Sequence, residues 1–353
     1  MLSGKLWPVH PHPYPNELMS SWLVRIAHAN GEKVQTFCHQ EFGVKHQVWN
    51  RDIDRLGPDW LLSQLAEKTA TAIKVVRQTT LKRYEGVLFQ HARNSGVEPW
   101  ITPLKVYHRK HNGFGMQFCP QCLKEDEEPY FRTHWRVALY TFCPKHQIMM
   151  HDRCQECGEP VAFHRIELGK GNEEVGLEKK LATCFNCGFY LAASKREKAD
   201  HLTWNVFENW QDTLLGLEGV SLTEYDIERL VVLHQFSKLL TSKATSEKLL
   251  KFIEETMSLS LNRPNLELKS FDKNDLSIRH QTIGCGWWLL MDWPNNLYWT
   301  WLNGAVRYNQ LLKDLWFIPS WYSAEVTFFN VNYRKRLDLL EKGNKTHSIH
   351  LPE

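Results

Sequence analysis

Four short motifs between residues 119 and 187 each carry two side chains of the kinds that bind metals. They are Cys119-Pro120-Gln121-Cys122, Cys143-Pro144-Lys145-His146, Cys154-Gln155-Glu156-Cys157 and Cys184-Phe185-Asn186-Cys187. Zinc in a structural site takes four Cys or His ligands in a tetrahedral arrangement. Two of these motifs complete one such site. The sequence therefore predicts two structural Zn²⁺ ions per chain.

The order of the motifs favours sequential pairing of the ligands. The predicted sets are Cys119, Cys122, Cys143 and His146 for the first site, and Cys154, Cys157, Cys184 and Cys187 for the second. An interleaved pairing, as in cross-braced fingers, fits the same spacing. Each bound ion would contribute about 10 kcal/mol or more to folding.

Other uses of the nine cysteines explain the pattern less well. Disulfides need an oxidising compartment, and the first residues contain no apolar signal core, so we expect no export. A thioredoxin-like motif would account for one Cys-x-x-Cys pair, not for four motifs. A catalytic zinc needs an open ligand position, whereas each set here has four ligands. Cys38 and Cys285 lie outside the motifs, and we expect both to be buried as small hydrophobic residues.

Length and composition place the chain among globular proteins of two or three folding units. It has 353 residues, of which 42% are hydrophobic and 24% are charged, close to the norm for soluble domains. A wholly disordered chain and a collagen are thereby excluded. The longest apolar run, residues 287–291, is far shorter than the roughly 20 residues that cross a bilayer, so we expect no membrane partner.

Apolar periodicity predicts a mainly helical fold on both sides of the cysteine motifs. The predicted helices cover approximately residues 14–31, 34–42, 59–69, 72–78, 222–240, 246–257, 278–291, 297–303 and 306–315. A short strand is predicted at 326–333. Residues 94–117 read as a loop, and 164–180 as an exposed excursion. Seven tryptophans between 287 and 321 could stack on single-stranded bases, but core packing and a partner interface explain them better.

Residues 65–77 have the rhythm of a helix-turn-helix, whose second helix can enter the DNA major groove. The outward side chains would be Lys74, Arg77, Gln78 and Thr79, with Lys82 and Arg83 near the phosphates. Two packed helices joined by a turn are also ordinary core architecture. DNA contact by these six residues is therefore a hypothesis.

The net charge of +3 is unevenly distributed along the chain. Residues 1–118 carry 15 Lys and Arg against 9 Asp and Glu, which gives them a net charge of +6. Residues 119–203 carry −1 and residues 204–353 carry −2. The positive charge therefore lies in the part that contains the candidate helix-turn-helix, a modest electrostatic footprint for DNA.

Several motifs, in order, resemble the TniQ family. They are Pro13-Tyr14-Pro15-Asn16-Glu17-Leu18-Met19-Ser20-Ser21-Trp22-Leu23-Val24-Arg25-Ile26-Ala27, Met116-Gln117-Phe118-Cys119-Pro120-Gln121-Cys122-Leu123, Tyr130-Phe131-Arg132, Trp135-Arg136, Cys143-Pro144-Lys145-His146, Asp152-Arg153-Cys154-Gln155-Glu156-Cys157-Gly158 and Cys184-Phe185-Asn186-Cys187-Gly188. The resemblance covers about residues 7–190. More loosely, residues 289–294 are similar to the C-terminal part of such proteins.

The resemblance implies a non-catalytic selector of target sites for a multi-gene DNA transposon, in a bacterial cytoplasm and near the nucleoid. Such a protein binds double-stranded DNA or a DNA-bound complex, and it recruits an AAA+ regulator and a transposase. The alternative within the family is an adaptor, often a homodimer, docked to a CRISPR RNA-guided effector complex. An enzyme is disfavoured, because the sequence lacks a Walker-type phosphate loop and a credible two-metal carboxylate cluster.

The family architecture agrees with a division of the chain into five parts. These are an N-terminal helical domain with the helix-turn-helix (1–95), a linker (96–117), tandem zinc fingers (118–200), a C-terminal helical domain (201–342) and a tail (343–353). The family's zinc ligands carry over onto the eight positions that the spacing selects.

Overall fold

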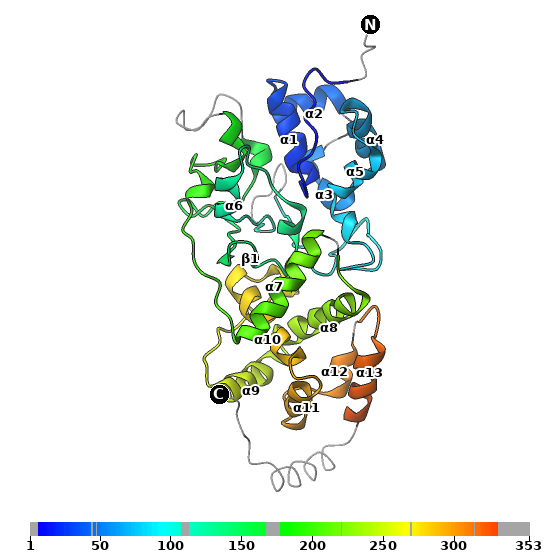
Figure 1. Cartoon of the computed structure of the whole chain (residues 1–353), viewed down its shortest axis with the longest axis vertical. Helices are drawn as coiled ribbons and strands as arrows, with labels where there is room; N and C mark the ends of the chain where they lie inside the picture. The colour runs from blue at the N-terminus through cyan, green and yellow to red at the C-terminus, as the bar shows by residue number, and fades with distance from the viewer. Residues whose placement is uncertain are drawn as a thin grey trace. The chain divides into compact units, whose positions relative to one another are not determined.

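The computed structural model describes residues 6–43, 45–46, 48–106, 113–166, 177–219, 221–268, 270–313 and 315–330 (Figure 1). Across these residues it contains thirteen α-helices and one two-stranded sheet. The prediction of a mainly helical fold is confirmed. None of the helices in the described ranges is long and apolar enough to cross a membrane. The predicted tail, 343–353, lies outside the described residues.

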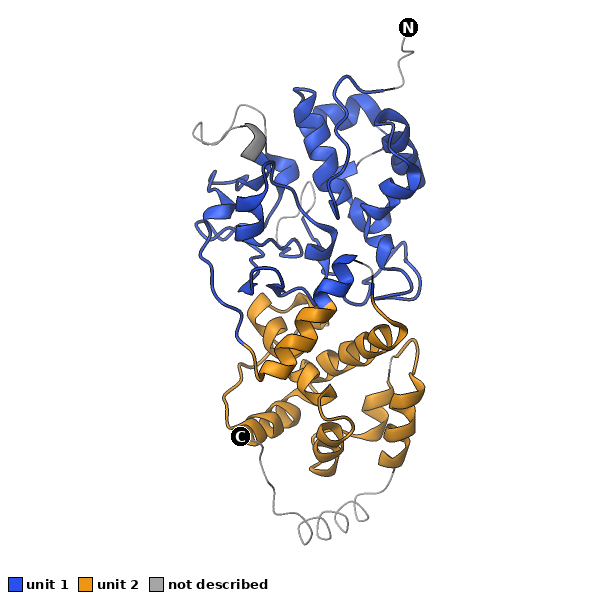
Figure 2. Cartoon of the chain, viewed as in Figure 1, with its two compact units in different colours: residues 1–200, 214–221 blue, residues 201–213, 222–353 orange. Residues whose placement is uncertain are grey.

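The chain divides into two compact units (Figure 2). Unit 1 comprises residues 1–200 and 214–221, and unit 2 comprises residues 201–213 and 222–353. Helix α7 (Trp204–Gly219) begins in unit 2 and ends in unit 1. The division expected near residue 95 falls inside unit 1.

The first half of unit 1 is helical. Its elements are α1 (Met19–Ala29), α2 (Val34–Phe42), η1 (Val48–Asn50), α3 (Ile53–Leu56), α4 (Asp59–Lys68), α5 (Ile73–Gln78) and η2 (Leu81–Tyr84). Helix α1 is buried over most of its length, so it forms the centre of this half. It begins later than the predicted residue 14, because Asn16 has a positive φ of 59° and the Leu18 N–H donates to the Phe131 carbonyl at 2.8 Å.

The second half of unit 1 has little regular structure. Its elements are α6 (Pro120–Glu125), η3 (Thr133–Arg136), the antiparallel strands β1 (Phe142–Cys143) and β2 (Ile148–Met149), η4 (Phe163–Arg165), η5 (Leu177–Ala182) and η6 (Leu191–Ala193). The prediction of an exposed excursion at 164–180 is wrong at its start. His164 and Ile166 are buried, and the Ile166 carbonyl lies 3.3 Å from His28 Nε2 on α1. Residues 167–176 lie outside the described ranges.

Buried ion pairs join the two halves of unit 1. Arg136, fully buried, donates to the Asp52 carboxylate at 2.6 Å. Arg25, only 4% exposed, donates to Glu17 at 2.8 Å and reaches Glu128 at 2.8 Å. Removal of one partner would leave an uncompensated buried charge, which typically costs about 3–5 kcal/mol. These pairs therefore fix the helices against the cysteine-rich segment.

Unit 2 is built on helices. They are α8 (Glu224–Leu240), α9 (Ser246–Met257), η7 (Phe271–Lys273), α10 (Leu276–Leu290), α11 (Asn295–Leu302), α12 (Tyr308–Leu312), α13 (Ser320–Val326) and η8 (Thr327–Phe329). Helix α8 starts at a capping box in which the Thr223 hydroxyl and the Asp226 carboxylate each bond the other residue's backbone N–H. Helix α10 is buried from Thr282 to Leu290 and packs on α8, so these two helices form the core of the unit.

The strand predicted at 326–333 is wrong over its described part, residues 326–330. Val326 ends α13 and the next three residues form η8, because the Phe329 ring packs back on Trp301 with centroids 4.8 Å apart. Trp287, Trp288 and Trp301 are buried, in line with the packing interpretation, whereas Trp299 and Trp316 are 38% and 37% exposed. Cys38 and Cys285 are also buried, as expected.

Candidate metal centres

The first cluster brings together Cys119, Cys122, Cys143 and His146. The three sulfurs each lie 3.4 Å from His146 Nδ1, and the Cys122 and Cys143 sulfurs are 3.7 Å apart. A tetrahedron with zinc–sulfur bonds of about 2.3 Å and a zinc–nitrogen bond of about 2.0 Å has sulfur–sulfur edges of about 3.8 Å and sulfur–nitrogen edges of about 3.5 Å. The four ligand atoms therefore fit a single zinc ion.

Two local structures present these ligands. Cys119 is the N-cap of α6, where its sulfur accepts from the Cys122 N–H at 3.4 Å and Pro120 occupies the first helical position. Of the other two ligands, Cys143 ends β1 and His146 lies in the turn to β2, which closes with a 2.7 Å bond from the Gln147 N–H to the Cys143 carbonyl. A short helix and a tight hairpin thus face each other across the cluster.

Glu125 orients the histidine of this cluster. Both of its carboxylate oxygens lie 3.1 Å from His146 Nε2, the ring nitrogen that does not face the sulfurs. Lys145 donates to the same carboxylate at 2.6 Å, and this bond is the main reason that the pKa of Glu125 falls to about 2. The ionised carboxylate fixes the tautomer in which Nδ1 is free to bind a metal, a common arrangement around zinc.

The second cluster brings together Cys154, Cys157, Cys184 and Cys187. Sulfur–sulfur distances are 3.7 Å between Cys154 and Cys187 and 3.6 Å between Cys157 and Cys184. The pairing is sequential in both clusters. The seven cysteines of the two clusters are free thiols. A disulfide would instead hold two sulfurs about 2.05 Å apart.

Two nearly identical turns build the second cluster. The Cys154 N–H donates to the Glu159 carbonyl and the Cys184 N–H to the Phe189 carbonyl, both at 2.8 Å. Each turn ends in a glycine at positive φ, Gly158 at 72° and Gly188 at 74°, which a residue with a Cβ adopts only with strain. The Cys-x-x-Cys-Gly sequence therefore determines the turn.

Crowding of the sulfurs favours a cation in the first cluster. Hydrogen bonding to Cys122 and Cys143 raises the pKa of the Cys119 thiol, whereas hydrogen bonds from Cys119 and Cys122 lower the pKa of Cys143 to about 3. One sulfur is thus ionised at the expense of another. A divalent ion would allow all three to be thiolates, the form that binds zinc.

The predicted DNA-contacting residues divide into two groups. Lys74, Arg77 and Gln78 are exposed on α5, while Val76 on the opposite side is buried. Helices α4 and α5 are joined by residues 69–72, in which Ala70 has a positive φ of 51°.

Lys82 and Arg83 are only partly exposed, and they contact their own chain. Lys82 donates from Nζ to the Gly57 carbonyl at 3.1 Å. Arg83 donates to Asn16 at 2.8 Å and to the Thr133 hydroxyl at 3.2 Å. The prediction that Thr79 faces outward is wrong, because Thr79 is buried and its hydroxyl donates to the Val76 carbonyl at 2.6 Å. The structure therefore leaves three of the six predicted side chains exposed.

These motifs and their geometry can be compared with a known family. Residues 8–150 match the TniQ family model. The suspected resemblance to TniQ is confirmed over this range, which contains the helical half of unit 1 and the first cluster; the second cluster begins beyond it, at Cys154. TniQ proteins are non-catalytic adaptors associated with transposition. No curated protein matches the chain.

Proposed function

We propose that this protein is the target-site selector of a multi-gene DNA transposon. It binds DNA or a DNA-bound complex in the bacterial cytoplasm, at the nucleoid, and recruits an AAA+ regulator and then the transposase. The TniQ match over residues 8–150 carries the proposal. It is supported by the position of the exposed cations, which lie in the same part of the chain.

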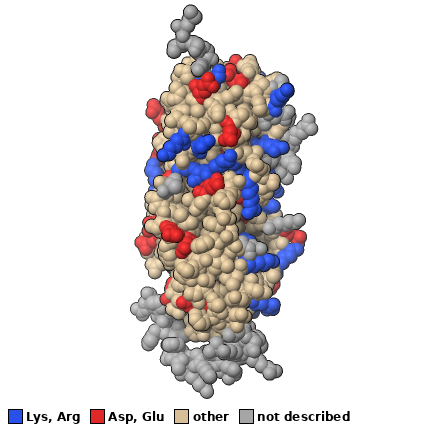
Figure 3. All heavy atoms as spheres, turned by 90° about the vertical axis from the view of Figure 1, so that its right-hand side faces the viewer, with Lys and Arg blue, Asp and Glu red and all other residues tan. Residues whose placement is uncertain are grey.

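The α4–α5 pair acts as the helix-turn-helix in this proposal. Lys74 and Arg77 on α5 would contact phosphates or guanine edges, and Gln78 would pair with adenine or a phosphate. Figure 3 shows Lys and Arg side chains forming a band across one face of unit 1. A surface rich in cations raises the local concentration of a polyanion and speeds its association.

The two clusters hold structural Zn²⁺ in this proposal. Each has four protein ligands, so a bound ion would have no open position for a substrate. The ions would then keep the cysteine-rich segment folded, and no chemistry is assigned to them.

One observation favours the adaptor alternative, in which a homodimer docks on a CRISPR RNA-guided effector complex. Ile73 and Val75 are 42% and 46% exposed on α5, beside Lys74. Helix α5 has only six residues. A short helix with an exposed apolar pair also suits contact with a protein, where the core of an interface is depleted of charge.

Binding of the full chain to a duplex that contains the transposon's insertion site distinguishes these functions. We expect salt-dependent binding that weakens in Lys74→Ala and Arg77→Ala, each with the salt slope reduced by about 1. Lys251→Ala, an exposed lysine on α9, removes the same charge and should change neither quantity. Failure to bind duplex at moderate salt, with stable co-purification on a CRISPR effector complex, would establish the alternative instead.

A further inference from the structure

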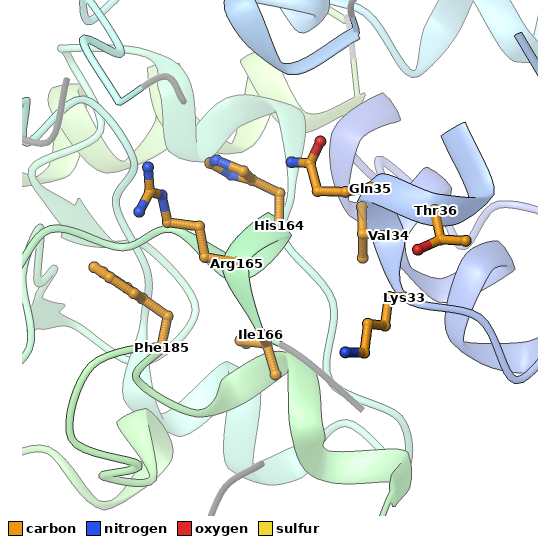
Figure 4. Close-up of a pocket in the computed structure, with 8 residues that line it drawn as sticks. All are labelled: Lys33, Val34, Gln35, Thr36, His164, Arg165, Ile166 and Phe185. Atoms are coloured by element: carbon orange, nitrogen blue, oxygen red, sulfur yellow. The ribbon is translucent and has the colours of Figure 1, made fainter. Parts of the chain in front are cut away.

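A pocket of about 320 Å³ in unit 1 has no metal-cluster ligand and no residue of α4 or α5 among its described lining residues (Figure 4). Its lining residues are Lys33, Val34, Gln35, Thr36, His164, Arg165, Ile166 and Phe185. One wall is the start of α2, and the other is η4 with the turn of the second cluster. Small-ligand sites in proteins begin at about this size.

The pocket is rich in groups that bind phosphate. Lys33 and Arg165 supply positive charge, and Gln35 and Thr36 supply polar side chains. None of the eight described lining residues is acidic. Lysine, arginine, glutamine and threonine side chains are the usual partners of DNA phosphates, so the lining selects for an anion.

The backbone of α2 adds further donors to the same wall. The N-cap residue Lys33 provides no side-chain bond to the helix, and the first turn contains no acidic residue. Among the described residues, no hydrogen bond is formed by the N–H groups of Val34, Gln35 or Thr36. Such N–H groups, at the positive end of the helix dipole, favour an anion.

The opposite wall is held in place before any ligand arrives. The His164 ring stacks on Trp49 with centroids 4.9 Å apart and planes at 5°. The Arg165 guanidinium lies over the Phe185 ring at 5.7 Å, and burial lowers its pKa because desolvation disfavours the charge. A bound anion would offset that cost. The two cations and the lack of an acidic residue among the described lining residues assign the pocket to a phosphate rather than to an uncharged base.

We infer that this pocket binds a backbone phosphate of duplex DNA, as a second contact besides α5. The inference rests on the proposed function, since that function supplies the DNA. The contact would position the protein on the duplex without reading its sequence, which is the usual role of phosphate contacts.

Amide NMR and binding measurements on the full, metal-loaded chain test this inference. Addition of a duplex should shift the amide signals of Val34, Gln35 and Thr36. Lys33→Ala and Arg165→Ala should each weaken duplex binding by about tenfold and lower the salt slope by about 1, uniformly across sequences. Lys251→Ala again serves as the control. Because Arg165 packs on Phe185, its variant is accepted only if its other amide signals are unchanged; Lys33 is exposed, so its variant tests the pocket without that risk.

Three results would overturn the inference. If the wild-type chain binds duplex and Lys74→Ala weakens binding, but Lys33→Ala binds as wild type and the α2 amides do not shift, the pocket is not a DNA contact and the proposed function stands. If inorganic phosphate shifts these amides and duplex does not, the pocket takes a free anion. If the wild-type chain binds no duplex, the direct-binding form of the proposed function fails together with the inference.

Discussion

Asp54 lies 1% exposed where the helical half of unit 1 meets the cysteine-rich half. Its carboxylate accepts from the Ser20 N–H and the Ser20 hydroxyl, both at 2.8 Å. The shortest contact of the Arg136 guanidinium is with the Asp52 carboxylate. Its distance to the Asp54 carboxylate is 3.6 Å. Burial, followed by repulsion from Asp52, raises the pKa of Asp54 to about 7. Asp54 is therefore a buried acid whose ionisation opposes folding.

Replacement of the Asp54 carboxyl by an amide should remove a pH dependence of the free energy of unfolding. The pKa of an aspartate in an unfolded chain is about 3.9, so between that value and about 7 the folded state holds a proton that the unfolded state has lost. The stabilising effect of that proton is complete below about pH 4 and is lost as the pH rises to 7. Between pH 5.5 and 7 the wild type should lose about 1.6 kcal/mol of unfolding free energy relative to Asp54→Asn, measured by urea unfolding of metal-loaded protein.

The comparison has an internal control, because both proteins carry the same metal ligands. Asp59→Asn makes the same chemical change at an exposed position in the first turn of α4, and its profile should follow the wild type. If the unfolding free energies of wild type and Asp54→Asn changed with pH in parallel, Asp54 would already be ionised in the folded protein.

At the scale of single elements, helix α6 supports the first cluster with one and a half turns. Cys119 caps it, Cys122 lies on it and Glu125 ends it, so residues three apart face the same side. Glu125 reaches the His146 ring from this position. The element supplies two ligands and the group that orients a third.

Loss of the orienting carboxylate should weaken the first site. Glu125→Gln removes the charge that holds His146, and we expect metal affinity at this site to fall by about tenfold or more, measured by competition with a chelator. Glu127→Gln changes an exposed carboxylate two residues further on and should leave affinity unchanged. Equal affinities for the two variants would mean that the Glu125 carboxylate does not support the site.

The sequence predicts elements best where the determinants are local. The eight Cys and His positions follow from spacing, and the starts and ends of α2, α4 and α5 follow from periodicity and glycine positions. Glu125 was missed because a surface carboxylate after a Cys-x-x-Cys has no distinguishing signal. The internal contacts of Arg83 were missed because Asn16 and Thr133 are far from it in sequence. The failed strand at 326–333 has the same cause: Phe329 packs on Trp301, a contact that periodicity does not report.

For the molecule as a whole, both clusters lie in unit 1, whereas unit 2 has its own helical core. A structural zinc ion is worth about 10 kcal/mol or more, comparable with the total stability of a domain, about 5–15 kcal/mol. If both clusters hold zinc as proposed, loss of the ions would therefore cost unit 1 a free energy comparable with its whole stability.

Removal of the metal should unfold the two units unequally. We expect close to two zinc ions per chain by elemental analysis. After chelation, hydrogen exchange should accelerate in unit 1 and stay slow in α8 and α10. Cys154→Ser should also cause misfolding of unit 1, whereas Cys285→Ser, which alters a cysteine outside the clusters, should keep both metal ions. Full protection of unit 1 in metal-free protein would refute the structural role.

Two contacts between the halves of unit 1 limit how its parts can be exchanged by recombination. They are the hydrogen bond between Leu18 and Phe131 and the ion pair between Asp52 and Arg136. Recombination that exchanged only the N-terminal helices would separate these partners and remove the carboxylates of Asp52 and Asp54 that face the Arg136 guanidinium. If α5 contacts DNA as proposed, new specificity is therefore more accessible through substitutions on its exposed side than through exchange of the helices. A chimaera that tests this should be joined after residue 221 rather than after the helices, because residues 214–221 also belong to unit 1.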